Sequence, residues 1–177
     1  MRKQYLTGLL AAAGALAVGS GLAVAGIGSG GPIVKTPGGE IFKVNKEAGD
    51  TLHFSPAVIT VRSGESVTFE KTDKSPDPHT ITLATKGQLP RSFERKCVPC
   101  TVALGHLKNP KDPEHSPIKT YILNKGQPGL DALGDSIALA PKGPHKSATV
   151  VISAPAGTTL YFLCAVHPWM QAKIIVK

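Results

Sequence analysis

A short apolar strand near the end of the chain runs directly into a loop that carries sulfur and nitrogen donors. The segment Tyr161–Met170 places Cys164, His167 and Met170 at three-residue intervals. Side chains alternate between the two faces of a strand, so Phe162 and Cys164 share one face. We therefore expect the strand to end near Cys164, with the thiol directed at the core. His167 and Met170 would then lie in the turn that follows.

The N-terminus is typical of a secretory signal peptide. Arg2 and Lys3 precede a small, apolar run from Tyr5 to Ile27, and Ala23-Val24-Ala25 is a small-x-small processing site. We expect residues 1–25 to be removed and the protein to be periplasmic or extracellular. An uncleaved membrane anchor is the alternative, because the run approaches the ~20 residues of a membrane-spanning helix.

The three cysteines add a constraint to an exported chain. Cys97 and Cys100 form a Cys-x-x-Cys and can pair with each other, which leaves Cys164 alone in a compartment where thiols tend to oxidise. A thiolate, imidazoles and a thioether are the donors of a blue-copper centre. We therefore expect one copper ion to occupy Cys164, together with His167 and Met170. This loop lacks only a second imidazole.

The remainder of the chain predicts short strands separated by turns. We interpret residues 26–50 as a linker leading into a first edge strand at 41–44, and residues 51–177 as one domain. Alternation around Ser63-Gly64-Glu65 predicts a hairpin of 59–61 with 67–69. Two further strands, 147–153 and 159–164, flank a turn, and 173–176 is the last strand. This pattern favours an all-β antiparallel sandwich or barrel.

A further strand supplies the missing imidazole. In Pro78–Leu83 the side chains of His79, Ile81 and Leu83 share one face, and Thr80 lies on the other. His79 is then directed at the core from a strand end, as Cys164 is. Two neighbouring strands could present both residues at one end of a sandwich.

These segments together resemble the cupredoxins of the plastocyanin, pseudoazurin and amicyanin group. The motifs that carry the resemblance are Phe54-x-Pro56, Ile59-Thr60-Val61-x-x-Gly64-x-x-Val67-Thr68-Phe69, Pro78-His79-Thr80 and Phe162-Leu163-Cys164-x-x-His167-Pro168-x-Met170. The short Cys-x-x-His-Pro-x-Met loop is most similar to amicyanin. The resemblance implies a Greek-key β-sandwich, a type 1 copper site and a soluble electron carrier.

The resemblance also assigns roles to single residues. It implies that His79, Cys164, His167 and Met170 are the metal ligands. It further implies that His167 shows a ring edge at an apolar electron-transfer surface beside Pro168 and Trp169. The position after the first ligand is commonly asparagine in the family and is Thr80 here, whose hydroxyl could still brace the cysteine loop by a hydrogen bond.

Residues 84–148 form an insertion that is longer than the small carriers of the family use. They hold ten Lys or Arg residues against five Asp or Glu residues, so most of the positive charge of the mature chain is local. Such a face could steer an acidic redox partner, or it could simply be a solvated loop. Nucleic acid is a poor candidate partner, since aromatic and basic residues do not interleave on strands.

The pair Cys97 and Cys100 allows several interpretations. A local disulfide that ties the insertion down is the leading one. The sequence offers no strand and helix context for a redox-active dithiol, and a zinc or second copper site with His106 and His115 would have irregular ligand spacing.

Two functions fit the copper. The protein is expected to be a monomeric one-electron carrier between redox partners; the alternative is a copper-binding protein for delivery, storage or resistance. Cargo sites usually carry methionine-rich or histidine-rich clusters, and Met170 is the single methionine besides Met1. We do not expect an enzyme, because four protein ligands leave no open position for a substrate.

Overall fold

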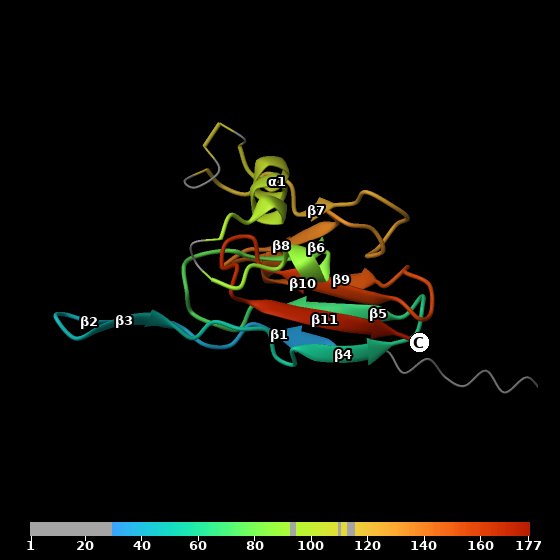
Figure 1. Cartoon of the computed structure of the whole chain (residues 1–177), viewed down its shortest axis with the longest axis horizontal. Coiled ribbons are helices and arrows are strands. Elements are labelled where there is room, and N and C mark those ends of the chain that lie inside the picture. The colour runs from blue at the N-terminus through green and yellow to red at the C-terminus, as the bar shows by residue number, and fades with distance from the viewer. Residues whose placement is uncertain (1–29, 93–94, 110, 113–115) are drawn as a thin grey trace, which may run out of the picture.

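The fold is a sandwich of two β-sheets around one hydrophobic core (Figure 1). A computed structural model describes residues 30–92, 95–109, 111–112 and 116–177. The signal peptide expected at residues 1–25 lies outside these residues. Among the helices of the described ranges, none is long and apolar enough to cross a membrane.

Within the described ranges, one sheet holds three strands and the other holds six. In spatial order the smaller sheet consists of β1 (Ile33–Lys35), β5 (Ser66–Glu70) and β9 (Ser147–Val151). The larger sheet consists of β4 (Val58–Val61), β11 (Gln171–Val176), β10 (Thr159–Leu163), β6 (His79–Ala84), β8 (Ser136–Leu139) and β7 (Ile122–Leu123). Neighbours are antiparallel except for the parallel pairs β1 with β5 and β4 with β11.

The predicted all-β sandwich is confirmed, but the predicted hairpin is wrong. β4 and β5 flank the turn at Gly64, yet they belong to different sheets. β4 alternates buried and exposed residues and β5 alternates buried and partly buried ones, because each strand turns one face to the same core from opposite sides. The strands before and after the 154–157 turn, β9 and β10, also lie in different sheets. Connections that cross between sheets in this way make a Greek-key sandwich.

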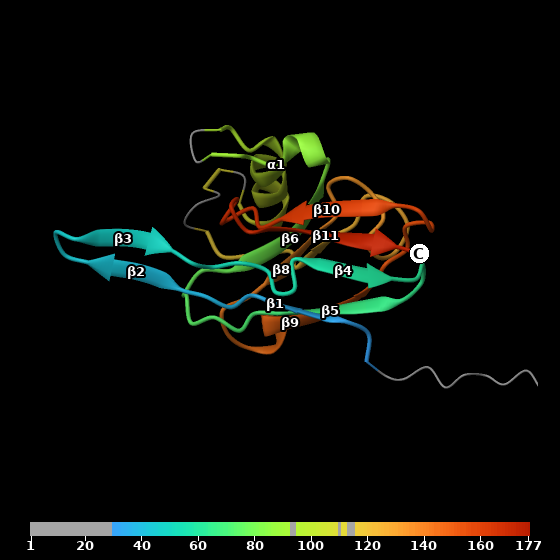
Figure 2. The same ribbon diagram turned by 60° about the horizontal axis from the view of Figure 1, so that its bottom comes forward.

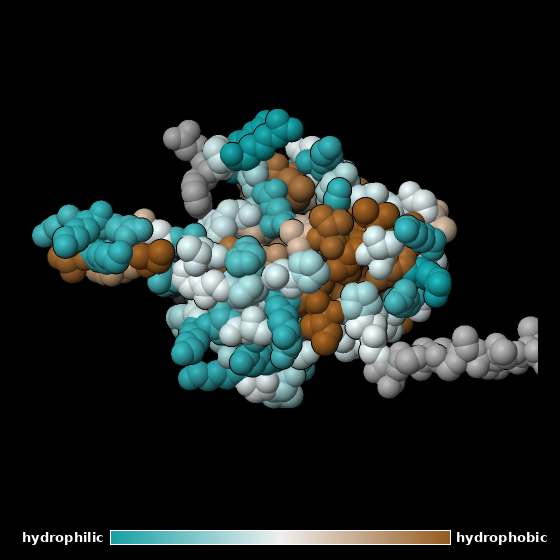
Figure 3. Space-filling view, turned by 90° about the horizontal axis from the view of Figure 1, so that it is seen from below, coloured by the Kyte–Doolittle hydropathy of each residue, from teal (hydrophilic) through white to brown (hydrophobic). Residues whose placement is uncertain are grey.

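The edge strand expected at 41–44 takes a different place. β2 (Glu40–Lys43) pairs only with β3 (Glu47–Asp50), and this hairpin projects from the sandwich (Figures 1 and 2). Phe42 is 79% exposed and Val44 is 70% exposed, so the apolar residues of the segment do not reach the core. Figure 3 shows the hairpin with hydrophobic atoms on one side and hydrophilic atoms on the other. The strand that joins the sandwich is the earlier β1, through buried Val34.

The insertion adds two strands to the larger sheet and covers its outer face with a helix. It contains η1 (Lys86–Gln88), α1 (Val98–Leu107), β7, β8 and η2 (Pro144–Lys146). α1 packs over β6 and β10 in a second apolar cluster, which includes Cys100, Leu107, Leu163 and Ala165. β6 is therefore buried on both faces, and the main core lies on its inner side only. This double cover positions the strand on which His79 lies.

Candidate metal centre

The two strands that carry the predicted donors are neighbours. β6 begins at His79 and pairs antiparallel with β10, whose last residue, Leu163, immediately precedes Cys164. The loop that follows β10 is closed by two backbone hydrogen bonds, from Cys164 N to Met170 O at 3.0 Å and from Met170 N to His167 O at 2.9 Å. The strand pairing and the loop closure together hold four residues at one end of the sandwich. These are His79 on β6 and Cys164, His167 and Met170 on the loop after β10.

Three donor atoms of these residues converge. Nδ1 of His79 lies 3.1 Å from Nδ1 of His167, and each of these nitrogens lies 3.7 Å from Sγ of Cys164. His79 and Cys164 are fully buried, and His167 is 4% exposed. The cluster can hold one metal ion between its three donors.

The spacing fits a copper ion with thiolate and imidazole ligands. Metal bonds of about 2.0 Å to nitrogen and about 2.3 Å to sulfur, at trigonal angles, separate a nitrogen from the sulfur by about 3.7 Å. That value matches both nitrogen–sulfur distances in the cluster. Two imidazoles and one thiolate are the equatorial donors that copper takes in blue-copper sites.

Met170 lies in the same loop and is fully buried. It belongs to the hydrophobic cluster that also contains Cys164. Its backbone bonds to Cys164 and His167 hold it beside the two loop donors. The structure therefore brings all four residues proposed as ligands to one end of the sandwich.

Thr80 links the strand of His79 to the cysteine loop. Its Oγ1 accepts a 2.7 Å hydrogen bond from the backbone N–H of Ala165. Its own backbone N–H donates to Sγ of Cys164 at 3.3 Å. The hydroxyl also contacts Oγ1 of Thr82 at 2.9 Å. The Thr80 hydroxyl is therefore hydrogen-bonded to the backbone of the residue that follows Cys164.

A buried ion pair lies behind His79, and the sequence reading missed it. Asp73 Oδ2 lies 2.8 Å from His79 Nε2, and Thr36 donates to the same oxygen at 2.8 Å. Asp73 Oδ1 lies 2.5 Å from Nζ of Lys71, which also donates to Ser75 O at 2.9 Å. A signal was present, because Lys71 and Asp73 continue the inward alternation of Val67 and Phe69.

Burial and this network set the protonation of the metal-free site. Burial lowers the pKa of His79 to about 4, although the Asp73 carboxylate acts in the opposite direction. Burial alone would raise the pKa of Asp73, but hydrogen bonds from Lys71 and Thr36 and the nearby His79 lower it to about 2. Burial also lowers the pKa of His167 and raises that of Cys164. The imidazoles are therefore neutral, as ligands must be, and a metal has to displace the thiol proton.

The surface expected to transfer electrons, at His167, Pro168 and Trp169, differs from the expectation in one respect. His167 is nearly buried, whereas Trp169 is 37% exposed and its ring meets the imidazole edge-on, with centroids 5.2 Å apart. Pro168 lies between them in the loop. Asp77 lies beside the other edge of His167, with Oδ2 3.8 Å from Nε2. Trp169, rather than the His167 imidazole, thus presents most of the ring surface to solvent.

Cys97 and Cys100 lie apart from this cluster and form a disulfide. Since the two sulfurs are bonded to each other, they do not provide a zinc or second copper site, and His115 lies outside the described residues. The pair does have a helix context that the sequence did not reveal, because Cys97 is the N-cap of α1. Cys164 is the free cysteine and is buried.

Comparison with known proteins gives fold-level similarities. No family model and no curated protein matches the chain. A solved auracyanin from Roseiflexus castenholzii is 19% identical with a TM-score of 0.42, over 71% of this chain and 87% of that one. A purple cupredoxin from Nitrosopumilus maritimus is 16% identical with a TM-score of 0.37, over 83% and 100%. A plastocyanin from Dryopteris crassirhizoma is 18% identical with a TM-score of 0.40, over 82% and 99%.

The donor cluster of this chain joins two parts of the fold. The structure has two sheets, with His79 on one strand and Cys164, His167 and Met170 on the loop before the last strand. That is the cupredoxin-like arrangement to which the sequence resemblance points, and its cluster can hold one copper ion.

Proposed function

We propose that the protein is an exported type 1 copper protein that carries single electrons between redox partners, with His79, Cys164, His167 and Met170 as the ligands. The observation that carries this proposal is the convergence of two Nδ1 atoms and one Sγ at distances that fit one copper ion. Copper bound to these donors would supply a one-electron couple between Cu(I) and Cu(II).

Each residue has a part that follows from its surroundings. Asp73 accepts a hydrogen bond from the N–H at Nε2 of His79, which fixes the tautomer that leaves Nδ1 free as a ligand. The Thr80 backbone N–H is directed at the sulfur of Cys164 and favours the thiolate. The two backbone bonds of the loop hold the remaining donors in place. A site braced from several elements rearranges little when an electron arrives or leaves.

The burial of the site supports a carrier over a cargo protein. His79 and Cys164 are both 0% exposed, so a copper chaperone has no exposed donor of theirs on which to begin ligand exchange. A four-donor site also leaves no position for a substrate, which argues against an enzyme. Export is supported by the sequence of residues 1–25 and by the combination of a disulfide with a single buried thiol.

The colour of the copper complex tests the site. The purified protein with one equivalent of Cu(II) should turn intensely blue through thiolate-to-copper charge transfer, and Cys164→Ser should abolish the colour. The double variant Cys97→Ser/Cys100→Ser is the matched control and should stay blue. A colourless Cu(II) complex of the wild-type protein would refute the type 1 assignment.

A second measurement separates the carrier from a cargo protein. A carrier should give a reversible one-electron potential and retain Cu(I) in the presence of a Cu(I) chelator. Rapid loss of Cu(I) to the chelator from a blue protein would favour copper delivery or storage instead.

A further inference from the structure

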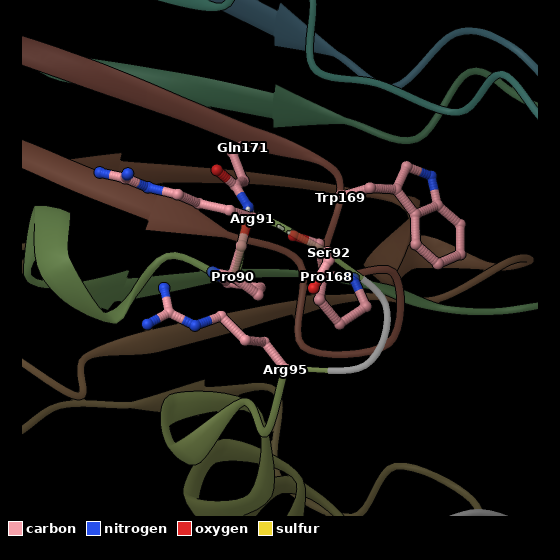
Figure 4. A pocket seen from close by; sticks show the side chains of 7 residues that line it. All are labelled: Pro90, Arg91, Ser92, Arg95, Pro168, Trp169 and Gln171. Carbon is pink, nitrogen blue, oxygen red and sulfur yellow. Dashed lines mark hydrogen bonds between the residues drawn. The ribbon is translucent and has the colours of Figure 1, made fainter.

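A pocket of about 430 Å³ lies where the insertion meets residues 164–170, the loop between β10 and β11 that carries three of the proposed ligands. We call this segment the ligand loop. Arg91 and Arg95 of the insertion line the pocket together with Pro168 and Trp169 of the ligand loop (Figure 4). In Figure 4 the two arginine side chains extend to one side, and the indole extends to the other. The pocket therefore has a cationic edge and an aromatic edge.

The insertion is fastened to the ligand loop at this pocket. The side-chain amide of Gln171 donates to the carbonyl oxygens of Pro90 and Pro168, both at 2.8 Å. One amide thus bridges the segment that carries Arg91 and the turn that carries Trp169. The two edges of the pocket are held in a fixed relation, which lowers the ordering cost of binding.

The two guanidinium groups of the cationic edge have no acidic salt-bridge partner among the described residues. Both Arg91 and Arg95 are exposed. An exposed guanidinium gains little from a single surface ion pair, but two of them beside a low-polarity wall attract anionic groups and steer their approach.

The aromatic edge leads to the donor cluster. The Trp169 ring is 37% exposed on one side and meets the His167 ring on the other. A group seated in the pocket is therefore separated from a ligand imidazole by one indole.

We propose that this pocket docks acidic side chains of the redox partner, which is accordingly a protein with a carboxylate-bearing patch beside an apolar contact. This inference rests on the proposed electron-carrier function. Carboxylates of the partner would pair with Arg91 and Arg95, and an apolar side chain would cover Trp169. Tryptophan and arginine are the residue types that contribute most at protein interfaces. A protein occupant uses both edges of the pocket, whereas a small inorganic anion uses only the cationic one.

Electron-transfer kinetics with two charged probes test the proposal. The copper-loaded full-length protein is mixed in a stopped-flow instrument with a small acidic c-type cytochrome and, separately, with a small basic one. The double variant Arg91→Gln/Arg95→Gln is compared with Lys46→Gln/Lys125→Gln, which removes the same charge from exposed residues that do not line the pocket. The blue absorbance of every variant shows whether the metal site is intact.

We expect the arginine variant to react with the acidic cytochrome about tenfold more slowly or worse at low ionic strength. The lysine variant should change less than about threefold, and the difference should shrink at high salt, because salt screens exposed charges. Equal losses in the two variants would show that only net charge matters and would overturn the proposal, as would an unchanged rate in the arginine variant.

Two further outcomes are distinguishable. Trp169 is the only tryptophan of the chain, so its fluorescence reports on the pocket. Quenching by inorganic phosphate at constant ionic strength, without any inhibition of the acidic cytochrome reaction, would assign the pocket to small anions and overturn protein docking. A wild-type protein that is not blue would refute the proposed function, whereas a blue protein with unaltered rates would refute the docking alone.

Discussion

Nε2 of His79 and Oδ2 of Asp73 lie 2.8 Å apart on the side of the imidazole that faces away from Cys164. The carboxylate accepts a hydrogen bond from the N–H at Nε2, which keeps the proton on that ring nitrogen and leaves Nδ1 free to bind a metal. Asp73 is itself held by Lys71, whose side chain is fully buried. A chain of three charged or polar side chains thus runs from the interior of the sandwich to the metal centre.

Removing the carboxylate should weaken both copper binding and the fold. Asp73→Asn leaves the Lys71 ammonium buried without a counter-ion, which costs about 3–5 kcal/mol. It also removes the anionic partner of His79, so Cu(II) affinity should fall about 10–100-fold. Urea unfolding and competition with a Cu(II) chelator measure the two effects.

The double variant Lys71→Met/Asp73→Asn separates those effects. It removes the unpaired ammonium, so the free energy of unfolding should recover while the Cu(II) affinity stays low. Recovery of both quantities together would show that Asp73 acts only by keeping the protein folded and does not orient His79.

The sequence indicated the residues proposed as donors and Thr80 beside them, but not the Lys71–Asp73 pair behind His79. His79, Cys164, His167 and Met170 could be proposed as ligands from the sequence because strand alternation and loop spacing place donors by local geometry. Lys71 was missed because a charged residue at an inward-facing strand position is normally taken to mark the end of the buried part of the strand. It is buried here only because Asp73 and Ser75 satisfy it, and those partners lie on the following loop.

Local sequence patterns also could not predict which strands belong to which sheet. β4 and β5 would show the same alternation whether they paired with each other or faced each other across the core. α1 was also missed, since its buried residues, Pro99, Cys100, Ala103 and Leu107, are mostly small and a proline stands near its start. Proline is tolerated in the first turn of a helix, where its missing N–H has no intrahelical partner.

The metal-free protein should lose stability as the solution is acidified. The pKa of His79 is lowered from 6.5 to about 4 in the folded state, so the unfolded chain binds a proton more readily between these values. The stabilisation is complete above pH 6.5 and declines toward pH 4, by on the order of 3 kcal/mol. His167 is shifted in the same direction.

A second decline should follow at lower pH. The pKa of Asp73 is lowered from 3.8 to about 2, so its contribution is present above pH 3.8 and is lost as the pH falls toward 2. Urea unfolding of the metal-free protein from pH 7 to pH 2 measures both steps. A free energy of unfolding that stays constant between pH 6.5 and 4 would contradict the neutral, buried state of His79.

Thr80 should be replaceable by serine but not by valine. Thr80→Val removes the oxygen that accepts from the N–H of Ala165, a residue that is 4% exposed. An unsatisfied buried N–H costs about 1–3 kcal/mol, and the loop beside Cys164 should shift to relieve it. We expect a lower unfolding free energy and a displaced blue absorption band for Thr80→Val, and wild-type values for Thr80→Ser. A loss in Thr80→Ser with wild-type values in Thr80→Val would assign the effect to the methyl group instead.

The disulfide should stabilise the insertion without tuning the copper. Cys97 and Cys100 are three positions apart. Closing so short a loop lowers the conformational entropy of the unfolded chain, which raises the free energy of unfolding by about 2 kcal/mol. Cys97→Ser/Cys100→Ser should therefore lower the free energy of unfolding by about that amount. Titration of the unfolded, metal-free wild-type protein with a thiol reagent should find one free thiol, that of Cys164, and three thiols would contradict the disulfide.

The blue spectrum of the same double variant decides how closely the insertion is coupled to the metal. Cys100 packs in the apolar cluster that contains Leu163 and Ala165, the two residues that flank Cys164. The backbone of Cys164 is nevertheless fixed by its own bond to Met170, and Ala165 by its bond to Thr80. These bonds do not depend on α1, so loosening the start of the helix should leave the position and intensity of the blue band unchanged. A shifted band would mean that helix packing, in addition to the loop's own hydrogen bonds, sets the position of the thiolate.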